Sequence, residues 1–485
     1  MRNASFLKQS KIRSIVCQNF RVLSIFVMLQ RHLFYWDQII NAQEPKINHS
    51  ADLKSFSQTT AIAVVIANMI GTGVFTSLGF QLLDIQSGFS LLMLWIIGGI
   101  TALCGALTYA ELGAALPRSG GEYNFLSHIY HPMAGFVSGW ISSTIGFSAP
   151  VALAAITFAA YFSSVFSVLP TNFLAIALIA LMALMHGSSR KTSAGTQWIF
   201  TLIKLLLIVV FCFAALFFVE TPQPVSFMPK SQDWSIMFSG AFAVSLIYVS
   251  YAYNGWNAAT YLSSELDNPQ QSLPRILIIG TVLVMLTYIA LNFVFLYSTP
   301  MLSMAGQLEI GYIVAQSMFG ETGARATGLI MSLLLVSTVS AMTMAGPRVL
   351  KVIGEDFSLF KSLSVVNRFG IPQRAVYFQS FLAIIFVITS SFESILVFSG
   401  FALALNNFFA VLGIFILRYR QPNLARPYKT WLYPVPPILF LLVSGWTLIY
   451  IVKEKPAQAL WSLLLIGLGI AFYWLSIHMG KKTRQ

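Results

Sequence analysis

The sequence predicts an all-α integral membrane protein with about 12 transmembrane helices. Three observations lead to this fold class. The 485-residue chain is 57% hydrophobic and 9% charged, whereas a soluble domain carries about 25% charged residues. Apolar runs of roughly 20 residues, the length that crosses a bilayer, follow one another from Phe56 onwards. Basic residues gather in alternate loops between these runs, as the positive-inside rule describes.

Polar loops that contain Pro and Gly separate the predicted spans. The spans are residues 56–80, 89–114, 133–163, 171–187, 196–219, 236–262, 274–298, 323–347, 375–391, 394–417, 430–450 and 458–478. With the N-terminus inside, the inside loops hold a long series of basic residues from Arg118 to Arg484. The outside loops and span ends hold Lys230, Arg325, Lys453 and Lys455. We therefore expect both termini to be cytoplasmic.

Residues 1–55 differ from the rest because they are polar and basic, with one apolar patch at residues 25–34. We predict a cytoplasmic or membrane-surface extension and assign it no function. The net charge of +13 is explained by the inside loops, so no nucleic-acid partner is expected. Cys104 and Cys212 lie in apolar runs and Cys17 in the extension, which disfavours a disulfide framework. The histidines lack metal-ligand spacing, and we expect no cofactor.

Two predicted spans carry helix-breaking residues near their middle. The first is Gly71-Thr72-Gly73 in "ANMIGTGVFTS", and the second is Asn254-Gly255 in "YAYNGWNAATYL". Glycine costs a helix interior roughly 0.5–1 kcal/mol relative to alanine. Close helix packing could explain one glycine pair. Two interruptions, five spans apart, indicate the binding site of a transporter.

The chemistry of such a break suits a free α-amino acid. Unwound backbone in a membrane must face protein, water or a ligand, because lipid offers no hydrogen bonds. A half-helix that begins after a break directs its N–H groups and positive dipole end at the gap, which favours a carboxylate. Carbonyls that end the preceding half-helix favour an ammonium group. An amino acid carries both.

Four stretches resemble the amino acid–polyamine–organocation (APC) superfamily of permeases, closest to its L-type amino acid transporters and bacterial serine/threonine exchangers. They are "IGTGVF" (70–75), "YAELGAALPRSGGEYNFL" (109–126), "YAYNGWNAATYLSSELDNPQQSLPR" (251–275) and "FILRYRQPNLARPYKTWLYPVPP" (415–437). The resemblance implies two inverted five-helix repeats, about 56–219 and 236–417, followed by two helices at about 430–478. It implies alternating access, with the transporter domain covering residues 56–485.

The resemblance also implies specific binding residues. The substrate carboxylate would meet the N–H groups of Gly71, Thr72 and Gly73. The amino group would meet carbonyls near Ile70 and on Tyr251 or Ala252. Tyr251 would be the aromatic gate, and the sixth-span signature supplies Trp256 and Asn257. Asn254 departs from the small residue usual in L-type members, which affects the expected size of the pocket.

Lys204 lies deep in the fifth span, in "IFTLIKLLLIVV". An ionisable residue at that depth is a functional hypothesis by default. Hydroxyls or carbonyls of the first and eighth spans could hold its ammonium, with Ser337, Thr338 and Ser340 as candidates. In sodium-independent relatives a lysine in this span occupies the place of a sodium ion, so Lys204 resembles a built-in cation. The alternative is a lysine that snorkels to an interface.

Three further polar residues lie in predicted spans or at their ends. We interpret Glu111, at the end of the second span, as a loop anchor, with a charged inner gate as the alternative. Asn406 and Asn407 lie in the middle of the tenth span. Such residues usually bond to a neighbouring helix, and a role in the pocket is the alternative.

Together these features predict a sodium-independent amino acid transporter, working as an exchanger. No acidic residue occupies the middle of spans 1, 3, 6, 8 or 10, which favours neutral substrates. The alternatives are a proton-coupled symporter that uses Lys204, a polyamine or cationic amino acid permease, a membrane-embedded enzyme, a channel, or a substrate sensor. No catalytic cluster supports an enzyme. We expect a bacterial inner-membrane protein, monomeric or homodimeric, without a disulfide-linked subunit.

Overall fold

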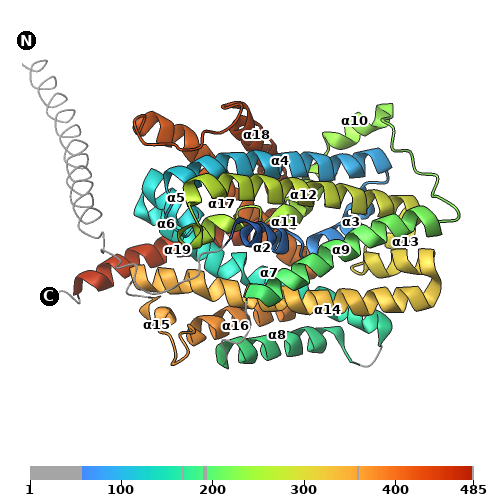
Figure 1. The fold of residues 1–485 in the computed structure, drawn as a ribbon, viewed down its shortest axis with the longest axis horizontal. Helices are drawn as coiled ribbons and strands as arrows, with labels where there is room; N and C mark the ends of the chain where they lie inside the picture. Colours follow the sequence, from blue (N-terminus) through green and yellow to red (C-terminus); the bar gives the residue numbers. More distant parts are fainter. Residues whose placement is uncertain (1–56, 167–168, 189–193, 358–359, 483–485) are drawn as a thin grey trace, which may run out of the picture. The chain divides into compact units, whose positions relative to one another are not determined.

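The computed structural model describes residues 57–166, 169–188, 194–357 and 360–482, and all regular structure within these ranges is helical (Figure 1). The predicted extension at residues 1–55, with Cys17, lies outside the described residues. Serines that accept a hydrogen bond from the first helical turn cap several spans. Others begin with proline in the first turn, where its missing N–H costs nothing. The serine caps precede α2, α4, α11 and α17.

The first half of the described chain holds the first five predicted spans. α2 (Gln58–Met69) and α3 (Gly73–Asp84) form one broken span, and α4 (Gly88–Ala115) follows. A short helix, α5 (Glu122–Ile129), leads into α6 (Pro132–Ile141), a π-helical turn at Ser142–Gly146, and α7 (Ser148–Val165). Next come α8 (Thr171–Ser188) and α9 (Ala194–Phe218). A π-turn inside a helix often marks a functional site.

The second half begins with α10 (Ser231–Met237), α11 (Gly240–Tyr253), the 3-10 helix η2 (Ala258–Glu265) and α12 (Pro269–Ser298). After α13 (Met301–Met304), α14 (Ile310–Asp356) is divided at Gly320, whose φ of 68° is not helical. The predicted eighth span lies in its second part. The remaining helices are α15 (Lys361–Ser364), α16 (Gln373–Thr389), α17 (Phe392–Arg420), α18 (Val435–Glu454) and α19 (Pro456–Lys482).

Within the described residues, nine helices are long and apolar enough to cross a membrane, or ten if the bent pair α10 and α11–η2 is one span. The other two predicted spans correspond to shorter apolar helices, Thr201–Ala215 within α9 and Gln373–Thr389. The predicted class, an all-α multi-pass membrane protein, is therefore confirmed. The division into two inverted repeats stays a prediction.

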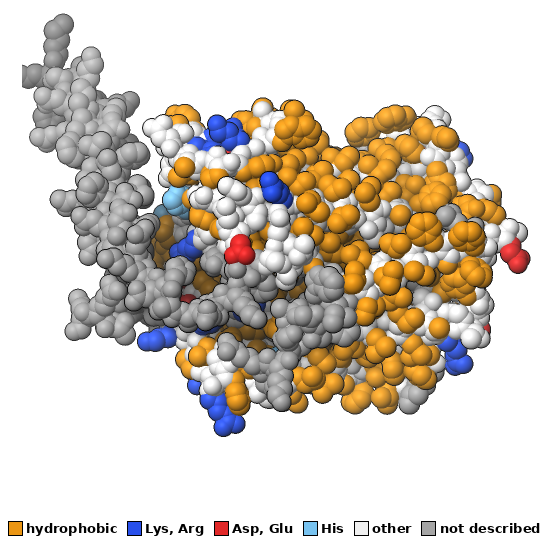
Figure 2. All heavy atoms as spheres, viewed as in Figure 1, with side chains coloured by type: hydrophobic (Ala, Val, Ile, Leu, Met, Phe, Trp, Pro, Cys, Tyr) orange, Lys and Arg blue, Asp and Glu red, His pale blue; other side chains and the backbone are white. Residues whose placement is uncertain are grey.

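Burial orders the spans from the centre of the bundle to its periphery. In the broken span α2–α3, 72% of the apolar window is buried, compared with 22% in α19. Figure 2 shows a broad hydrophobic face with charged side chains toward its ends. Exposed large apolar side chains on α9, α12 and α14 belong to this kind of surface, and they include Leu206, Phe213, Phe217, Leu283, Leu286 and Leu333. Such a surface suits contact with lipid.

Candidate functional site

The two predicted breaks lie directly against each other in the bundle. A Cβ atom on Gly73 would lie 2.6 Å from the Cα atom of Ala252. Gly255 has a φ of +110°, and a Cβ there would lie 2.8 Å from the carbonyl carbon of Asn68. Real Cβ atoms do not approach so closely, so both glycines are required for backbone-to-backbone packing between the first and sixth spans.

A cavity of about 460 Å³ adjoins these breaks, within the range of small-molecule sites. Its walls come from α2, α3, the π-turn, α11, η2, α14 and α17, and it reaches the α4–α5 loop. Most of the predicted binding residues line it. They are Gly71, Thr72, Gly73, Tyr251, Ala252, Asn254 and Asn257, together with Thr338, Asn406 and Asn407.

The first break leaves amides at the start of α3. The Gly71 N–H donates to the Met69 carbonyl at 2.8 Å, so in this conformation it is occupied. Thr72 is the N-cap of α3, and its carbonyl accepts from the Phe75 N–H at 3.0 Å. Helix geometry leaves the first amides after the cap, Gly73 and Val74, without intrahelical acceptors. Ile70 is buried and does not line the cavity.

Tyr288 of α12 links the carbonyl ends of the two broken helices. Its hydroxyl lies 2.5 Å from the Met69 carbonyl oxygen and 3.1 Å from that of Ala252. The side chain is fully buried. A phenol has a single hydrogen to donate, so it can satisfy only one of these oxygens at a time. Sequence reasoning missed Tyr288, because a tyrosine in an apolar run carries no sign of its partners.

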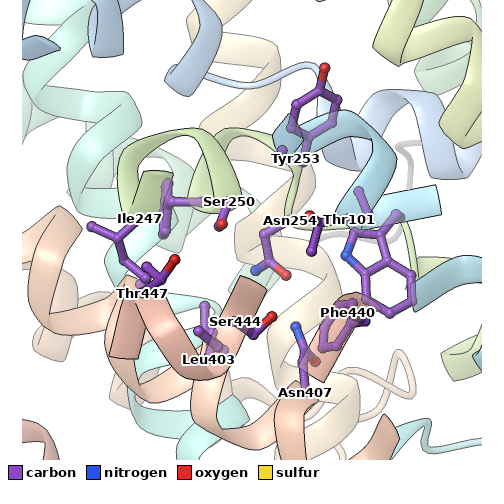
Figure 3. A pocket seen from close by; sticks show the side chains of 16 residues that line it. Thr101, Ile247, Ser250, Tyr253, Asn254, Leu403, Asn407, Phe440, Ser444 and Thr447 are labelled. Carbon is purple, nitrogen blue, oxygen red and sulfur yellow. The ribbon is translucent and has the colours of Figure 1, made fainter. Parts of the chain in front are cut away.

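A second cavity, of about 40 Å³, lies between α4, α11, α17 and α18 (Figure 3). Tyr251, Asn254, Leu403 and Asn407 line both cavities, so they form the wall between them. Trp256, predicted as a binding residue, lines only the smaller cavity. Its ring packs edge-on against Tyr109 and Phe440, with centroids 4.6 and 6.3 Å away.

Lys204 is 4% exposed, and its ammonium nitrogen donates to the Thr338 hydroxyl at 2.7 Å. Of the three candidate hydroxyls, Thr338 is therefore the partner, and it lines the large cavity. Ser340 instead bonds to His186 of α8 at 2.8 Å. The buried Ser337 hydroxyl has no hydrogen-bond partner within the described residues. Lys204 thus places a cation one side chain away from the cavity.

Glu122 begins α5 and reaches the same cavity from the side of the α4–α5 loop. Its carboxylate is 1% exposed and accepts hydrogen bonds from the Asn257 amide and, at 2.7 Å, from the Tyr261 hydroxyl. The predicted residue Asn257 therefore links the segment after the sixth-span break to the start of α5. Sequence reasoning did not place Glu122 in the cavity because α5 lies outside the predicted spans.

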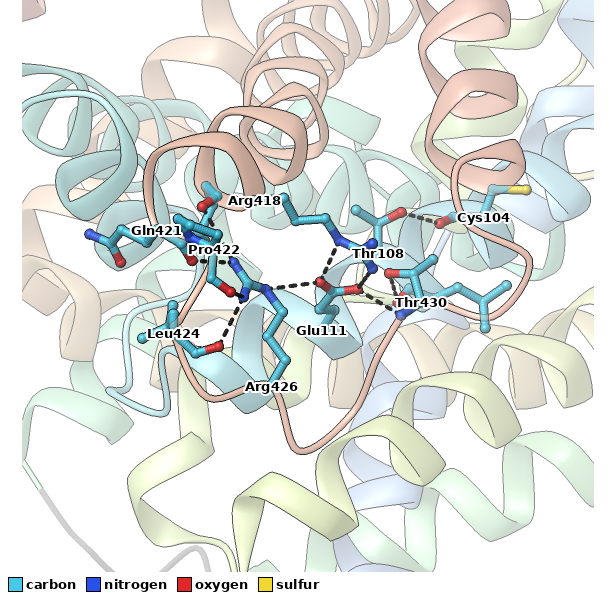
Figure 4. A network of polar contacts seen from close by, with 11 residues as sticks. Cys104, Thr108, Glu111, Arg418, Gln421, Pro422, Leu424, Arg426 and Thr430 are labelled. Atoms are coloured by element: carbon cyan, nitrogen blue, oxygen red, sulfur yellow. Dashed lines mark hydrogen bonds and ion pairs between the residues drawn. The ribbon is translucent and has the colours of Figure 1, made fainter.

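Glu111 is the centre of a separate network (Figure 4). Arg418 donates two hydrogen bonds to its carboxylate, at 2.9 and 2.7 Å, and the Thr430 N–H donates a third at 2.6 Å. Arg426 lies 3.5 Å away and donates to the carbonyls of Leu417, Gln421, Pro422 and Leu424. This geometry matches the interpretation of Glu111 as a loop anchor.

The opposite end of the site is closed by packed side chains. The Tyr161 hydroxyl of α7 accepts a hydrogen bond from the Gly311 N–H of α14 at 2.9 Å. The ring of Phe80, in α3, stacks on that of Phe392, in α17, with centroids 5.5 Å apart. The residues that line the large cavity include Ser119 and Gly120 of the α4–α5 loop, and they include none of these four residues.

Comparison with known proteins identifies the family. The amino acid permease family model matches residues 56–472. The human b(0,+)-type amino acid transporter 1 is 28% identical over 453 residues, which cover 91% of each chain. The mouse large neutral amino acids transporter small subunit 2 is 26% identical over 448 residues, 89% of this chain and 82% of the relative. The chain belongs to the amino acid permease family, and it is accordingly a multi-pass membrane transporter of amino acids rather than an enzyme.

Proposed function

We propose that the protein exchanges neutral amino acids across the membrane without sodium, by alternating access. The observation that carries this proposal is the pair of abutting breaks beside a cavity of about 460 Å³. The amides of Thr72 and Gly73, two cavity-lining residues at the start of α3, would bind the carboxylate. The Ala252 carbonyl, near the end of α11, would bind the ammonium group, because the Met69 carbonyl already accepts from the Gly71 N–H and the Tyr288 hydroxyl.

Lys204 supports independence from sodium. Its ammonium sits 2.7 Å from Thr338, a cavity residue, and supplies a fixed positive charge beside the break. A sodium ion bound next to this group would meet electrostatic repulsion in a medium of low dielectric constant. The proton-coupled symporter that uses Lys204 remains the alternative mechanism.

The cavity lining supports neutral side chains as the preferred substrates. Among the described lining residues, the charged ones are Glu122 and Arg348. Both Glu122 oxygens already accept hydrogen bonds from neutral donors, and the Arg348 side chain is exposed. The charged α-amino and carboxylate groups of the substrate would therefore be bound at the two breaks. The rest of the cavity presents the uncharged amides of Asn254, Asn406 and Asn407 to the substrate side chain.

In this proposal the structure is the inward-facing state. The cavity communicates with the end that holds the α4–α5 loop, which the distribution of basic residues assigns to the cytoplasm. Both termini would then be cytoplasmic, in the cell membrane of a bacterium. The covalent link to a second subunit is not expected, because Cys104 and Cys212 lie inside α4 and α9.

The test is uptake into proteoliposomes in sodium-free buffer. Vesicles loaded with unlabelled amino acids are expected to accumulate labelled substrate, and empty vesicles are not. Omitting one amino acid at a time from the load identifies the substrates. Uptake into empty vesicles that follows an inward proton gradient would instead establish the symporter.

A further inference from the structure

Glu122 is the acidic side chain among the described residues that line the large cavity. It is 1% exposed, so its carboxylate is shielded from bulk solvent yet borders a space that solution can enter. A buried carboxylate is costly unless it is paired or changes its protonation state. The identity of its neighbours therefore decides what this group does.

The neighbours of Glu122 are neutral hydrogen-bond donors. Asn257 and Tyr261, both from the inner half of the sixth span, donate to its two oxygens. Tyr109 of α4 also contacts the carboxylate, and its hydroxyl donates to Asn407 of α17 at 3.1 Å. Within the described residues, none of the ion pairs includes Glu122.

Within the described residues, no Lys, Arg or His nitrogen forms an ion pair with the Glu122 carboxylate. Arg118 of the α4–α5 loop pairs with Asp356 of α14 at 3.6 Å. Tyr123, the next residue in α5, donates its hydroxyl to the same Asp356. Arg348 of α14 lines the exposed end of the cavity. The elements packed around Glu122 therefore place no cation against its carboxylate.

Glu111, which is buried, and Glu393, which is half-buried, differ in this respect. Glu111 is held by two arginines, Arg418 and Arg426. Glu393 pairs with Lys455 at 2.8 Å. These groups have a cation that stabilises their ionised form, whereas Glu122 has none. Burial raises the pKa of the Glu122 carboxyl above its ordinary value, although the hydrogen bonds from Tyr261 and Asn257 oppose that rise.

We propose that Glu122 is a proton-binding site of the transport cavity. A hydronium ion that enters with the solution transfers one proton to a carboxylate oxygen, which forms the carboxylic acid and leaves water. The bound proton neutralises the buried charge. Release reverses the step, from acid to water. Proton binding at Glu122 would make exchange depend on the pH of the solution in the cavity. This consequence, unlike the proton binding itself, rests on the proposed transport function.

The sign of the linkage is fixed by the direction of the pKa change. Because the folded-state pKa is raised, the folded protein favours the neutral acid. The stability contribution of Glu122 is complete at pH values below the ordinary glutamate pKa of about 4.3 and is lost as the pH rises through the folded-state value. Any conformation that hydrates Glu122 binds the proton less tightly.

The experiment measures thermal unfolding of the purified full-length protein between about pH 4 and about pH 8, a range that begins near the ordinary glutamate pKa of about 4.3. We expect the midpoint temperature of the wild type to fall, relative to Glu122→Gln, as the pH rises. Tyr261→Phe removes a hydrogen bond to the ionised form, so its transition is expected at higher pH than in the wild type. Glu355→Gln, at an exposed ion pair with Lys351, is the matched control and should retain the wild-type transition.

Exchange in proteoliposomes over the same pH range supplies the second readout. The wild type is expected to show a transition that Glu122→Gln loses. Superimposable stability profiles of wild type and Glu122→Gln, or an unshifted Tyr261→Phe, would overturn the proposal. If Glu122→Gln does not fold, the proposal is tested by whether Tyr261→Phe shifts the pH of the stability transition. If the wild type exchanges no amino acid, the proposed function fails, while the stability profiles still decide the role of Glu122.

Discussion

Substituting alanine for each glycine of the first break is expected to affect a different property: stability at Gly73 and substrate affinity at Gly71. A methyl group on Gly73 would lie 2.6 Å from the Cα and Cβ atoms of Ala252, whereas carbon atoms in contact lie about 3.5–4.0 Å apart. The first and sixth spans would have to separate by about 1 Å, and overpacking of this kind costs about 1–3 kcal/mol. A methyl group on Gly71 would lie 3.9 Å from the Thr338 methyl carbon, which is an ordinary contact.

Gly73→Ala should therefore lower the unfolding temperature, and Gly71→Ala should leave it near that of the wild type. In Gly71→Ala the added methyl occupies the cavity beside the break, so substrate affinity should fall at least about tenfold, or about 1.4 kcal/mol. Thermal unfolding and equilibrium binding of a labelled amino acid measure the two effects. If Gly71→Ala binds the amino acid with wild-type affinity, the substrate does not bind at this break. Undiminished stability of Gly73→Ala would refute the close packing of the two spans.

Three further substitutions test the rest of the site. Glu111→Gln leaves the Arg418 guanidinium without its carboxylate and should cost about 3–5 kcal/mol of stability, while Lys351→Gln, at an exposed ion pair, should change thermal unfolding by at most about 1 kcal/mol. Lys204→Met should abolish exchange in proteoliposomes while size-exclusion chromatography shows folded protein, and normal exchange at every pH would end the fixed-cation hypothesis. Tyr288→Phe should lower exchange by removing the hydroxyl that donates to the Met69 carbonyl, and unchanged kinetics would show that this hydroxyl is dispensable.

The positions of the spans and of both breaks could be predicted because they depend on local properties of the chain. The length of an apolar run locates a span. Gly71, Gly73 and Gly255 weaken a helix whatever their tertiary contacts are. The contacts of these residues depend on tertiary packing, which the sequence does not display. Gly73 and Gly255 face backbone of the partner span, whereas Gly71 faces the cavity.

The same limit explains the residues that were missed or moved. Three hydroxyls of α14 were candidate hydrogen-bond partners for Lys204. The packing of α8 against α14 shows that Ser340 bonds to His186 and that Thr338 bonds to Lys204. Trp256 follows the break in sequence, yet its ring turns toward α4 and the smaller cavity. Glu122 lies in a loop helix that no membrane-span argument would place beside the large cavity.

Tyr288 suggests how the site distinguishes an empty cavity from an occupied one. Its single hydroxyl hydrogen faces two carbonyl oxygens, on Met69 at 2.5 Å and on Ala252 at 3.1 Å. The shorter contact takes the hydrogen, which leaves the Ala252 oxygen with an unused lone pair at the end of α11. A buried carbonyl in that condition is a strong acceptor. An ammonium group that reaches Ala252 would meet a group already prepared to accept it, next to the α3 amides that receive the carboxylate. Because these acceptors and donors belong to different half-helices, a bound amino acid would add polar bonds between the first and sixth spans to the backbone packing at Gly73 and Gly255.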